Sequence, residues 1–299
     1  MRYVNAVHST LIVCAGMSFA LVASAGEGVD KTLPAAANGY VKIVITRGEV
    51  DITGWDRDEV HIEGELDDLA EGLVFVMEGD RTRIEVKLPR RNVNWGGGSD
   101  LDIRVPMNSK IDFDGVSTDT TIGMVSGGVR VRTVSGDITA SEIQNQVRIN
   151  TVSGNIDVSA SSGDTHISTV SGEIHLDMNS SRIVLNSVSG EIEAQFEEFT
   201  QLRANVVSGD IEVSGKLAGE GKIEIASVSG DISLELEGPV NAHLSAEVGP
   251  GGDIDNSVSD DEPVNKFPGR KKLEVQFGDG SGQINLRTVT GDIRIDDRS

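Results

Sequence analysis

A five-residue motif recurs through the second half of the chain and constrains its fold more than any other feature. The motif reads Val-Ser-Gly, then an acidic or amide residue, then Ile. The first four copies start 18 residues apart, and the next two gaps are 19 and 21 residues. A short fixed period indicates coils that stack on one another, so the sequence predicts an all-β, parallel β-solenoid. The copies begin at Val134, Val152, Val170, Val188, Val207 and Val228, and a threonine variant begins at Val289.

Within each repeat, apolar and polar residues alternate, as they do in strands with one buried face. In one coil, Ile174, Leu176 and Met178 share a side, and Ile183 and Leu185 repeat the pattern about nine residues later. Each coil is therefore expected to contain two short strands and two turns. The coils are expected to stack about 4.8 Å apart through parallel strand pairing.

Stacked coils place equivalent residues in columns along the solenoid. We expect the motif isoleucines to form one buried column and the motif valines to form a second. The glycines are expected to share a turn position where a positive φ excludes a Cβ atom. The isoleucines are Ile138, Ile156, Ile174, Ile192, Ile211, Ile232 and Ile293, the valines are Val134, Val152, Val170, Val188, Val207 and Val228, and the glycines are Gly136, Gly154, Gly172, Gly190, Gly209, Gly230 and Gly291.

The repeats predict a single solenoid domain, because a solenoid lengthens without needing a second core. Residues 26–133 alternate less regularly and are expected to form irregular coils and a terminal cap. Residues 134–255 contain the regular repeats. Residues 256–272 are predicted to be an inserted loop rich in charge and proline, and residues 273–299 the C-terminal coils.

The first 25 residues are typical of an export signal. Arg2 precedes an apolar run, and Ala23-Ser24-Ala25 has the small-residue pattern that signal peptidase cuts. The alternative, a membrane anchor, needs about 20 apolar residues, more than this run provides. Cleavage would remove Cys14, the only cysteine, so packing and hydrogen bonds alone would hold the mature fold. We therefore expect a periplasmic, extracellular or envelope-associated protein.

The chain has 48 acidic and 26 basic residues, which gives a formal net charge of −22. This balance argues against binding to nucleic acid or to an anionic membrane surface, because like charges repel. It permits cationic partners. It is also typical of a sheet-rich rod kept soluble by its charge.

The repeats and two earlier motifs together resemble the bacterial putative-adhesin domain family. The earlier motifs are Glu49-Val-Asp-Ile52 followed by Gly54-Trp55, and Leu101-Asp-Ile-Arg-Val-Pro106. The similarity extends from about Tyr40 to Asp296. Members of that family are exported or envelope-linked β-solenoids of unknown function. The resemblance therefore implies a non-enzymatic scaffold that presents a face to a protein or glycan, and it carries over no catalytic residue.

Motifs of known catalytic sites do not occur in the sequence. His61, His166, His175 and His243 share no spacing, and there is no nucleophile elbow, zinc-binding helix motif or phosphate loop. Parallel β-helices include polysaccharide lyases and hydrolases, whose sites need clustered carboxylates and aromatic platforms for sugar rings. A polysaccharide-active enzyme is therefore the third of three hypotheses.

The acidic residue after each motif glycine raises the second hypothesis, a cation-dependent module with calcium or a basic peptide as ligand. Stacked carboxylates repel one another, and a bound cation would relieve that repulsion. The chain lacks the paired glycines of calcium-binding β-rolls, which argues against a structural calcium ladder. A separate acidic group is a weaker metal-site candidate, with a solvated loop as its alternative: Asp253, Asp255, Asp260 and Asp261.

Two irregular segments are the predicted partner-binding sites, because binding energy gathers at aromatic and arginine residues. One is the loop that carries Trp95. The other is the densest basic cluster of the acidic chain, which could dock an acidic partner or pair with the protein's own acidic turns. This basic cluster contains Lys266, Phe267, Arg270, Lys271 and Lys272.

Overall fold

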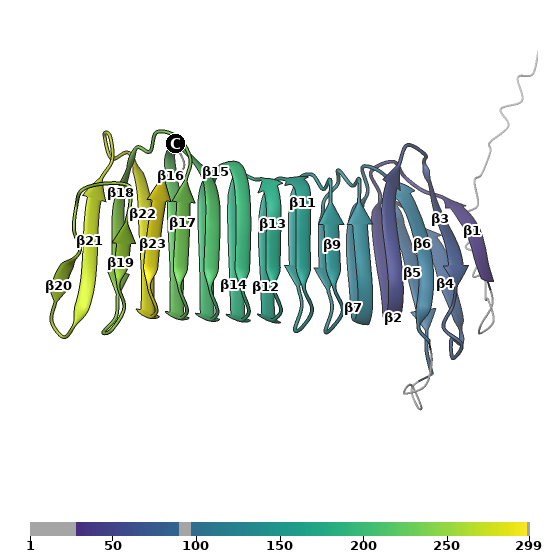
Figure 1. Cartoon of the computed structure of the whole chain (residues 1–299). Helices are drawn as coiled ribbons and strands as arrows, with labels where there is room; N and C mark the ends of the chain where they lie inside the picture. The colour runs from purple at the N-terminus through teal and green to yellow at the C-terminus, as the bar shows by residue number, and fades with distance from the viewer. Residues whose placement is uncertain (1–27, 90–96, 298–299) are drawn as a thin grey trace, which may run out of the picture.

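The computed structural model describes residues 28–89 and 97–297. The expected signal peptide, residues 1–25, and Trp95 lie outside the described residues. Figure 1 shows strands ranged side by side along one axis. Throughout the described ranges no helix is long and apolar enough to cross a membrane.

The described residues form 23 strands. Four of them, β2, β7, β15 and β16, continue around a corner of the solenoid and contribute to both of its faces. The strands are β1 (Gly28–Pro34), β2 (Tyr40–Trp55), β3 (Glu59–Glu65), β4 (Gly72–Glu78), β5 (Arg81–Lys87), β6 (Ser99–Pro106), β7 (Lys110–Gly123), β8 (Val129–Arg132), β9 (Ile138–Ser141), β10 (Gln146–Asn150), β11 (Ile156–Ser162), β12 (Asp164–Ser171), β13 (Ile174–Asn179), β14 (Arg182–Ser189), β15 (Ile192–Ser208), β16 (Ile211–Ser229), β17 (Ile232–Leu236), β18 (Ala242–Val248), β19 (Ile254–Asn256), β20 (Val264–Lys266), β21 (Arg270–Gln276), β22 (Gly282–Thr290) and β23 (Ile293–Asp297).

Each regular coil contributes one strand to each of two facing layers, here called sheet I and sheet II. Sheet I contains the strand that follows each motif, for example β9, β11 and β13, which pair in parallel. Sheet II contains the strand that precedes each motif, for example β8, β10 and β12, which also pair in parallel. The predicted two-strand coil and parallel β-solenoid are confirmed.

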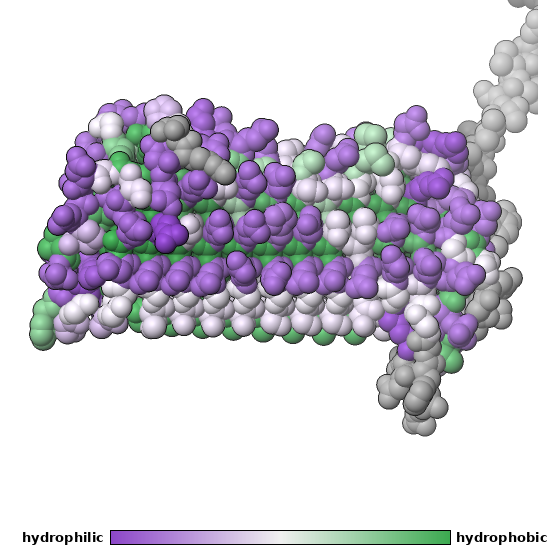
Figure 2. Space-filling model, viewed as in Figure 1, coloured by the Kyte–Doolittle hydropathy of each residue, from purple (hydrophilic) through white to green (hydrophobic). Residues whose placement is uncertain are grey.

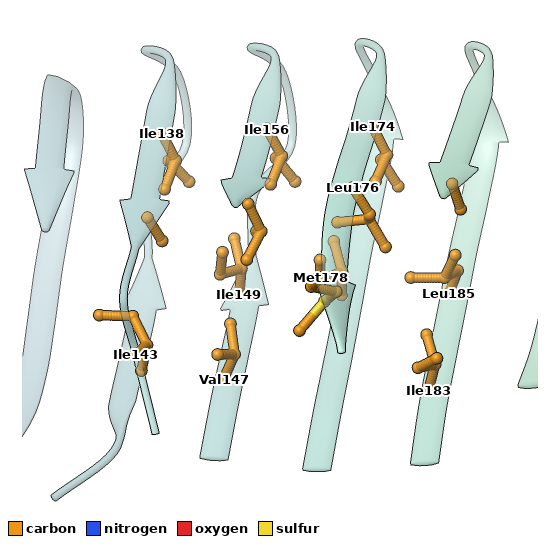
Figure 3. Close-up of a cluster of buried hydrophobic side chains, with 14 of the residues drawn as sticks. Ile138, Ile143, Val147, Ile149, Ile156, Ile174, Leu176, Met178, Ile183 and Leu185 are labelled. Atoms are coloured by element: carbon orange, nitrogen blue, oxygen red, sulfur yellow. The ribbon is translucent and has the colours of Figure 1, made fainter. Parts of the chain in front are cut away.

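The apolar core lies between the two sheets. The motif isoleucines pair in register from coil to coil and are buried, as predicted. Figure 3 shows Ile138, Ile156 and Ile174 at the same position of successive coils. Side chains of sheet II, such as Ile149 and Leu185, complete the core.

The prediction that the motif valines are buried is wrong. Each of them exposes about half of its surface, between 46% and 51%. The residue before each valine turns inward instead: Thr133 is buried, and its hydroxyl donates a hydrogen bond to the Ser135 carbonyl, 2.9 Å away. The valine follows the alternation of the preceding strand, and the turn at the motif glycine resets that alternation before the isoleucine.

The motif glycines have the positive φ that the sequence predicts. Gly172 has φ 123°, and a Cβ built on it would lie 2.2 Å from the carbonyl oxygen of Gly154 in the next coil. Only a residue without a side chain fits this close backbone stacking. The same conformation holds at Gly136, Gly154, Gly190, Gly209, Gly230 and Gly291.

In the coils that carry the motif, variation in coil length is confined to the turn opposite the motif. In three successive coils, the inward residues Ile183, Leu202 and Ile223 each precede the next motif isoleucine by nine residues. The extra residues of the longer coils lie on the other side, where the pairing of β15 with β16 shifts register near Phe196 and Phe199. The motif edge is therefore the regular edge of the solenoid.

Coil order differs from chain order at both ends. At the N-terminal end, β2 lies between β5 and β6 on one side and β7 on the other. Antiparallel pairs β1–β3, β3–β6 and β4–β5 cover this end of the solenoid and form an irregular cap. At the C-terminal end, β22 lies between β16 and β18, and β23 lies between β17 and β19.

The segment 256–272 is not a free loop, in contrast to the prediction. It contains β20 and the start of β21, which pair as an antiparallel hairpin, and β21 pairs antiparallel with β18. This hairpin closes the C-terminal end of sheet II, at the far end of Figure 1 from β1. Its outermost strand is short, exposed, and flanked by Pro263 and Pro268, which are features that block further strand pairing.

Candidate functional site

The outer face of sheet I carries a continuous column of acidic or amide residues at the position after the motif glycine. Figure 2 shows a hydrophilic row that runs along the solenoid. Strand register extends this column beyond the motif into the first coils, which the sequence analysis did not detect. In coil order the column contains Asp100, Glu49, Asp119, Asp137, Asn155, Glu173, Glu191, Asp210, Asp231, Asp292 and Asp253.

Most short side chains in this acidic column bind the backbone of the next coil. The Asp137 carboxylate accepts a hydrogen bond from the Asn155 N–H at 2.7 Å, and Asp210 accepts one from the Asp231 N–H at 2.7 Å. Such bonds satisfy an amide that the glycine turn leaves without a strand partner. The motif acid therefore has a structural role, and its carboxylate is held in place on the outer surface.

A second outward column beside the first is also rich in acid. It includes Asp102, Asp51, Asp157, Glu193, Glu212 and Asp255, interrupted by Thr139, His175 and Arg294 among others. Sheet I is consequently an acidic face along the whole solenoid.

Sheet II has a different outer surface. One of its outward columns contains, in coil order, Arg83, Lys42, Asp112, Arg130, Arg148, His166, Val184, Arg203 and Glu224. The net negative charge is thus concentrated on sheet I. The alternation of inward and outward positions within each repeat could have revealed this separation of charge between the two sheets, whereas composition alone could not.

A half-buried ion cluster lies at the N-terminal part of sheet II. Arg132 contacts Asp112 at 3.0 Å and Asp114 at 2.6 Å, and Lys42 contacts Asp112 at 3.3 Å. Burial, together with the hydrogen bond that Tyr40 donates to Asp112, raises the pKa of Tyr40 to about 12. Burial alone would raise the pKa of Asp114, but hydrogen bonds from Arg132 and Lys42 outweigh it and lower that pKa. These groups satisfy one another and stabilise the sheet.

The predicted basic cluster pairs mainly with the protein's own acids. The contacts are Arg270 to Glu247 at 3.2 Å, Lys271 to Asp253 at 2.7 Å and Lys272 to Glu274 at 2.8 Å. Lys266 is exposed at the end of β20, and the adjacent Phe267 is 97% exposed. Because the three paired cations lie on β21, the structure supports their role in holding the terminal hairpin.

The predicted metal-site candidates do not converge. The hydrogen bond from Lys271 lowers the pKa of Asp253, and Asp255 lies 3.8 Å from Arg294. Asp260 and Asp261 belong to the segment between β19 and β20, where Asp261 accepts a hydrogen bond from Ser259. Within the two described ranges, no group of three or more His, Cys, Asp or Glu residues is placed to hold a metal ion.

The histidines do not form a catalytic group either. His166 belongs to β12 in sheet II, whereas His175 belongs to β13 in sheet I. His61 lies in the N-terminal cap beside Trp55, with ring centroids 6.2 Å apart, and His243 is on β18. The structure therefore keeps the four apart: His166 and His243 share sheet II but lie several coils from each other, and His175 and His61 lie in sheet I and in the cap.

Comparison with solved structures finds a similar fold in a distant protein. A crystal structure from Parabacteroides distasonis, described as a putative lipid binding protein, superposes with TM-score 0.51 at 14% identity, covering 92% of this chain and 98% of that chain. A putative adhesin from Bacteroides fragilis gives TM-score 0.39 at 12% identity, covering 90% and 97% of the two chains. A comparison with curated proteins finds no match.

Comparison with family models gives a match over nearly all of the described chain. The matching model is that of Toastrack DUF4097, and the matched residues are 40–296. The match includes the regular coils, the C-terminal hairpin and the antiparallel cap except for β1. This chain belongs to the Toastrack DUF4097 family.

Proposed function

We propose that this protein is a non-enzymatic, exported scaffold of the cell envelope that presents the acidic face of sheet I to a protein or glycan with complementary positive charge. The observation that carries the proposal is the acidic column, which continues from Asp100 to Asp253 on one face of a straight solenoid. The opposite face carries a mixture of charges with many cations.

The geometry of the acidic face suits an extended cationic partner. Carboxylates repeat about every 4.8 Å along the axis, so their fields add over a long surface and steer cations toward it. Backbone hydrogen bonds fix several of these carboxylates, for example Asp137 and Asp210. A partner therefore meets an already ordered row of charges, which lowers the entropy cost of binding.

The non-enzymatic part of the proposal rests on the site chemistry and the family. The described histidines do not come together, and the family has no known catalytic activity. Export rests on the signal-like first 25 residues, and N-terminal sequencing of the purified protein would test cleavage after Ala25.

The test measures the binding of an oligolysine peptide to the protein by isothermal titration calorimetry, at 50 and at 300 mM NaCl. The variant Asp157→Asn/Glu193→Gln/Glu212→Gln removes three charges from sheet I without touching the hydrogen-bonded column. We expect it to weaken binding about tenfold at 50 mM NaCl, with a smaller effect at 300 mM, where charges are screened.

The matched control removes the same number of charges from sheet II, with Glu85→Gln/Asp164→Asn/Glu224→Gln. We expect binding by this control to equal that of the unchanged protein. If both triple variants weaken binding equally, net charge rather than the acidic face attracts the peptide, and the proposal fails.

A further inference from the structure

The motif valines form an exposed apolar row on the regular edge of the solenoid, between the two sheets. Val116 and Val289 extend the row in register, because Ser117 pairs with Ser135 and Thr290 pairs with Ser229. Every valine of this row is 46% to 51% exposed. Figure 2 shows a line of hydrophobic residues along one long edge, beside a band of near-neutral residues. We call the row from Val116 to Val289 the valine edge.

The valine edge is large for a monomer. At about 4.8 Å per coil its length is on the order of 30 Å. Half-exposed valines in successive coils amount to an apolar stripe on the order of 600 Å², which is the upper end for the largest patch of a monomeric protein. A serine or threonine follows each valine in the sequence, and no charged residue lies within the row of valines itself.

The fold itself does not require valine at this position. The inward threonine and the glycine set the turn, and the valine side chain points to solvent. About half of the surface of each valine stays uncovered by the rest of the chain. A polar residue would serve the turn equally well, so the uncovered half indicates a contact outside the chain.

We propose that the valine edge is a self-association surface, on which a second copy of this chain docks edge to edge. A two-fold axis places the same stripe on both copies, so the stripe is complementary to itself. Burial of both stripes removes about 1,200 Å² from water, which reaches the lower limit of stable protein interfaces.

Charge selects the relative direction of the two copies. One border of the valine edge is the acidic column of sheet I. The other border is the last outward position of sheet II, which begins with the ion pair of Asp114 and Arg132, continues through neutral residues such as Asn150 and Asn186, and ends at Arg287. With the two-fold axis along the solenoid, each acidic column faces this border of the partner copy, which carries no net negative charge. With the copies antiparallel, the two acidic columns of sheet I face each other and repel along their whole length, so the parallel arrangement of the solenoid axes is favoured.

The first test is sedimentation equilibrium of the protein from 1 to 200 µM at 150 and 500 mM NaCl. We expect a dimer whose dissociation constant is several-fold lower at 500 mM than at 150 mM NaCl. The reason is that salt screens the repulsion between two chains of net charge −22. Val152→Lys/Val170→Lys/Val188→Lys is expected to weaken the dimer at least tenfold. The matched control, Thr139→Lys/Gln195→Lys/Gln201→Lys, adds the same charge at exposed positions away from the edge and should leave it unchanged.

The second test fixes the orientation without destabilising substitutions. In a Cys14→Ser background, Val116→Cys and Val289→Cys place single thiols at the two ends of the edge. In a parallel dimer the same residue of the two copies meets, so each variant alone forms a disulfide-linked dimer. In an antiparallel dimer position 116 of one copy meets position 289 of the other, so a disulfide forms only when the two variants are mixed.

Three results would overturn the proposal. One is a monomer throughout the concentration range, and another is a dimer that the valine substitutions leave intact. The third is a monomer that co-floats with phosphatidylcholine vesicles in a valine-dependent way, which would assign the edge to a membrane. Cross-linking only in the mixture would overturn the parallel arrangement.

Discussion

At the residue scale, each position of the motif has a separate physical task. The threonine before the motif turns inward and bonds the turn, the valine faces out, the glycine permits close stacking of backbones, and the acid binds the next coil. The isoleucine then returns to the core. Substitutions within one motif copy should therefore differ sharply in cost.

Ile174→Asp tests the buried column, because Ile174 is 1% exposed and the substitution places a charge between the two sheets. We expect a loss of at least about 4 kcal/mol of unfolding free energy, or aggregation. Val170→Asp, four residues earlier in the same copy, is the matched control and should cost about 1 kcal/mol or less. Thermal melting followed by circular dichroism measures both. Equal melting temperatures would mean that the assigned register is incorrect.

Gly172→Ala tests the stacking of turns. The new Cβ would lie 2.2 Å from the Gly154 carbonyl oxygen, at a φ that disfavours alanine, so we expect a loss of about 3 kcal/mol. Gly79→Ala provides a comparison, since Gly79 also has a positive φ but no atom lies within 4 Å of its built Cβ. That control should lose about 1 kcal/mol. Urea unfolding of both variants separates steric contact from backbone strain.

At the element scale, the two ends of the solenoid depend on contacts that the repeat does not provide. The connection between β3 and β4 is held by Asp67, which is 1% exposed and forms an ion pair with Arg47 on β2. Asp67 also accepts a hydrogen bond from the Leu69 N–H at 2.8 Å. The hydrogen bond from Arg47 is the main cause of the lowered pKa of Asp67.

This ion pair predicts a pH dependence. Because the pKa of Asp67 is lowered on folding, its contribution is fully present above the unfolded value of about 4 and is lost as pH falls through the folded value. Asp67→Asn should cost about 3 kcal/mol at pH 7, because it removes the buried charge that pairs with Arg47. Urea unfolding at pH 7, 4 and 3 should show a smaller loss of stability on acidification in the variant than in the unchanged protein. Parallel pH profiles would contradict this assignment.

A deletion tests whether the C-terminal hairpin stabilises the end of the solenoid. Replacement of Ser257–Lys272 by a short glycine linker removes β20 and the start of β21, and it exposes the edge of β18. We expect a loss of several kcal/mol and concentration-dependent aggregation, because an uncovered edge pairs with other chains. Lys266→Ser/Phe267→Ser, at exposed positions of the same hairpin, should change stability by less than about 0.5 kcal/mol. A deletion variant that melts like the unchanged protein would show that the hairpin is dispensable.

At the scale of the whole molecule, the arrangement of charge determines which ligands suit the protein. Of the two hypotheses, a scaffold and a calcium-dependent module, the stacked carboxylates favour the second. Several of these carboxylates, however, already accept hydrogen bonds from backbone amides, which occupies oxygens that calcium would need. We therefore expect the melting temperature to rise by less than about 1 °C between 0 and 5 mM calcium, with magnesium as the control. A rise of several degrees specific to calcium would favour the cation-dependent module, because a ligand of the folded state stabilises it.

The sequence by itself determined the β-solenoid, the two strands per coil, the buried isoleucine column and the glycine turn. All four follow from a short period and from the alternation of apolar residues within it, which are local properties. The valines were misassigned because Val170 and Ile174 are an even number of residues apart. Period-2 counting puts them on one face, but the positive φ of Gly172 lies between them and ends the alternation.

Only the tertiary structure decided the order of the terminal coils, the separation of charge and the exposed valine edge. Parallel pairing requires a matching pattern and not chain proximity, so Ile293 stacks on Ile232 from 61 residues away. Composition gives net charge without position, and strand register was needed to place the acids on sheet I and many cations on sheet II. Long-range pairing sets these features, because it determines which side chains become neighbours on the surface.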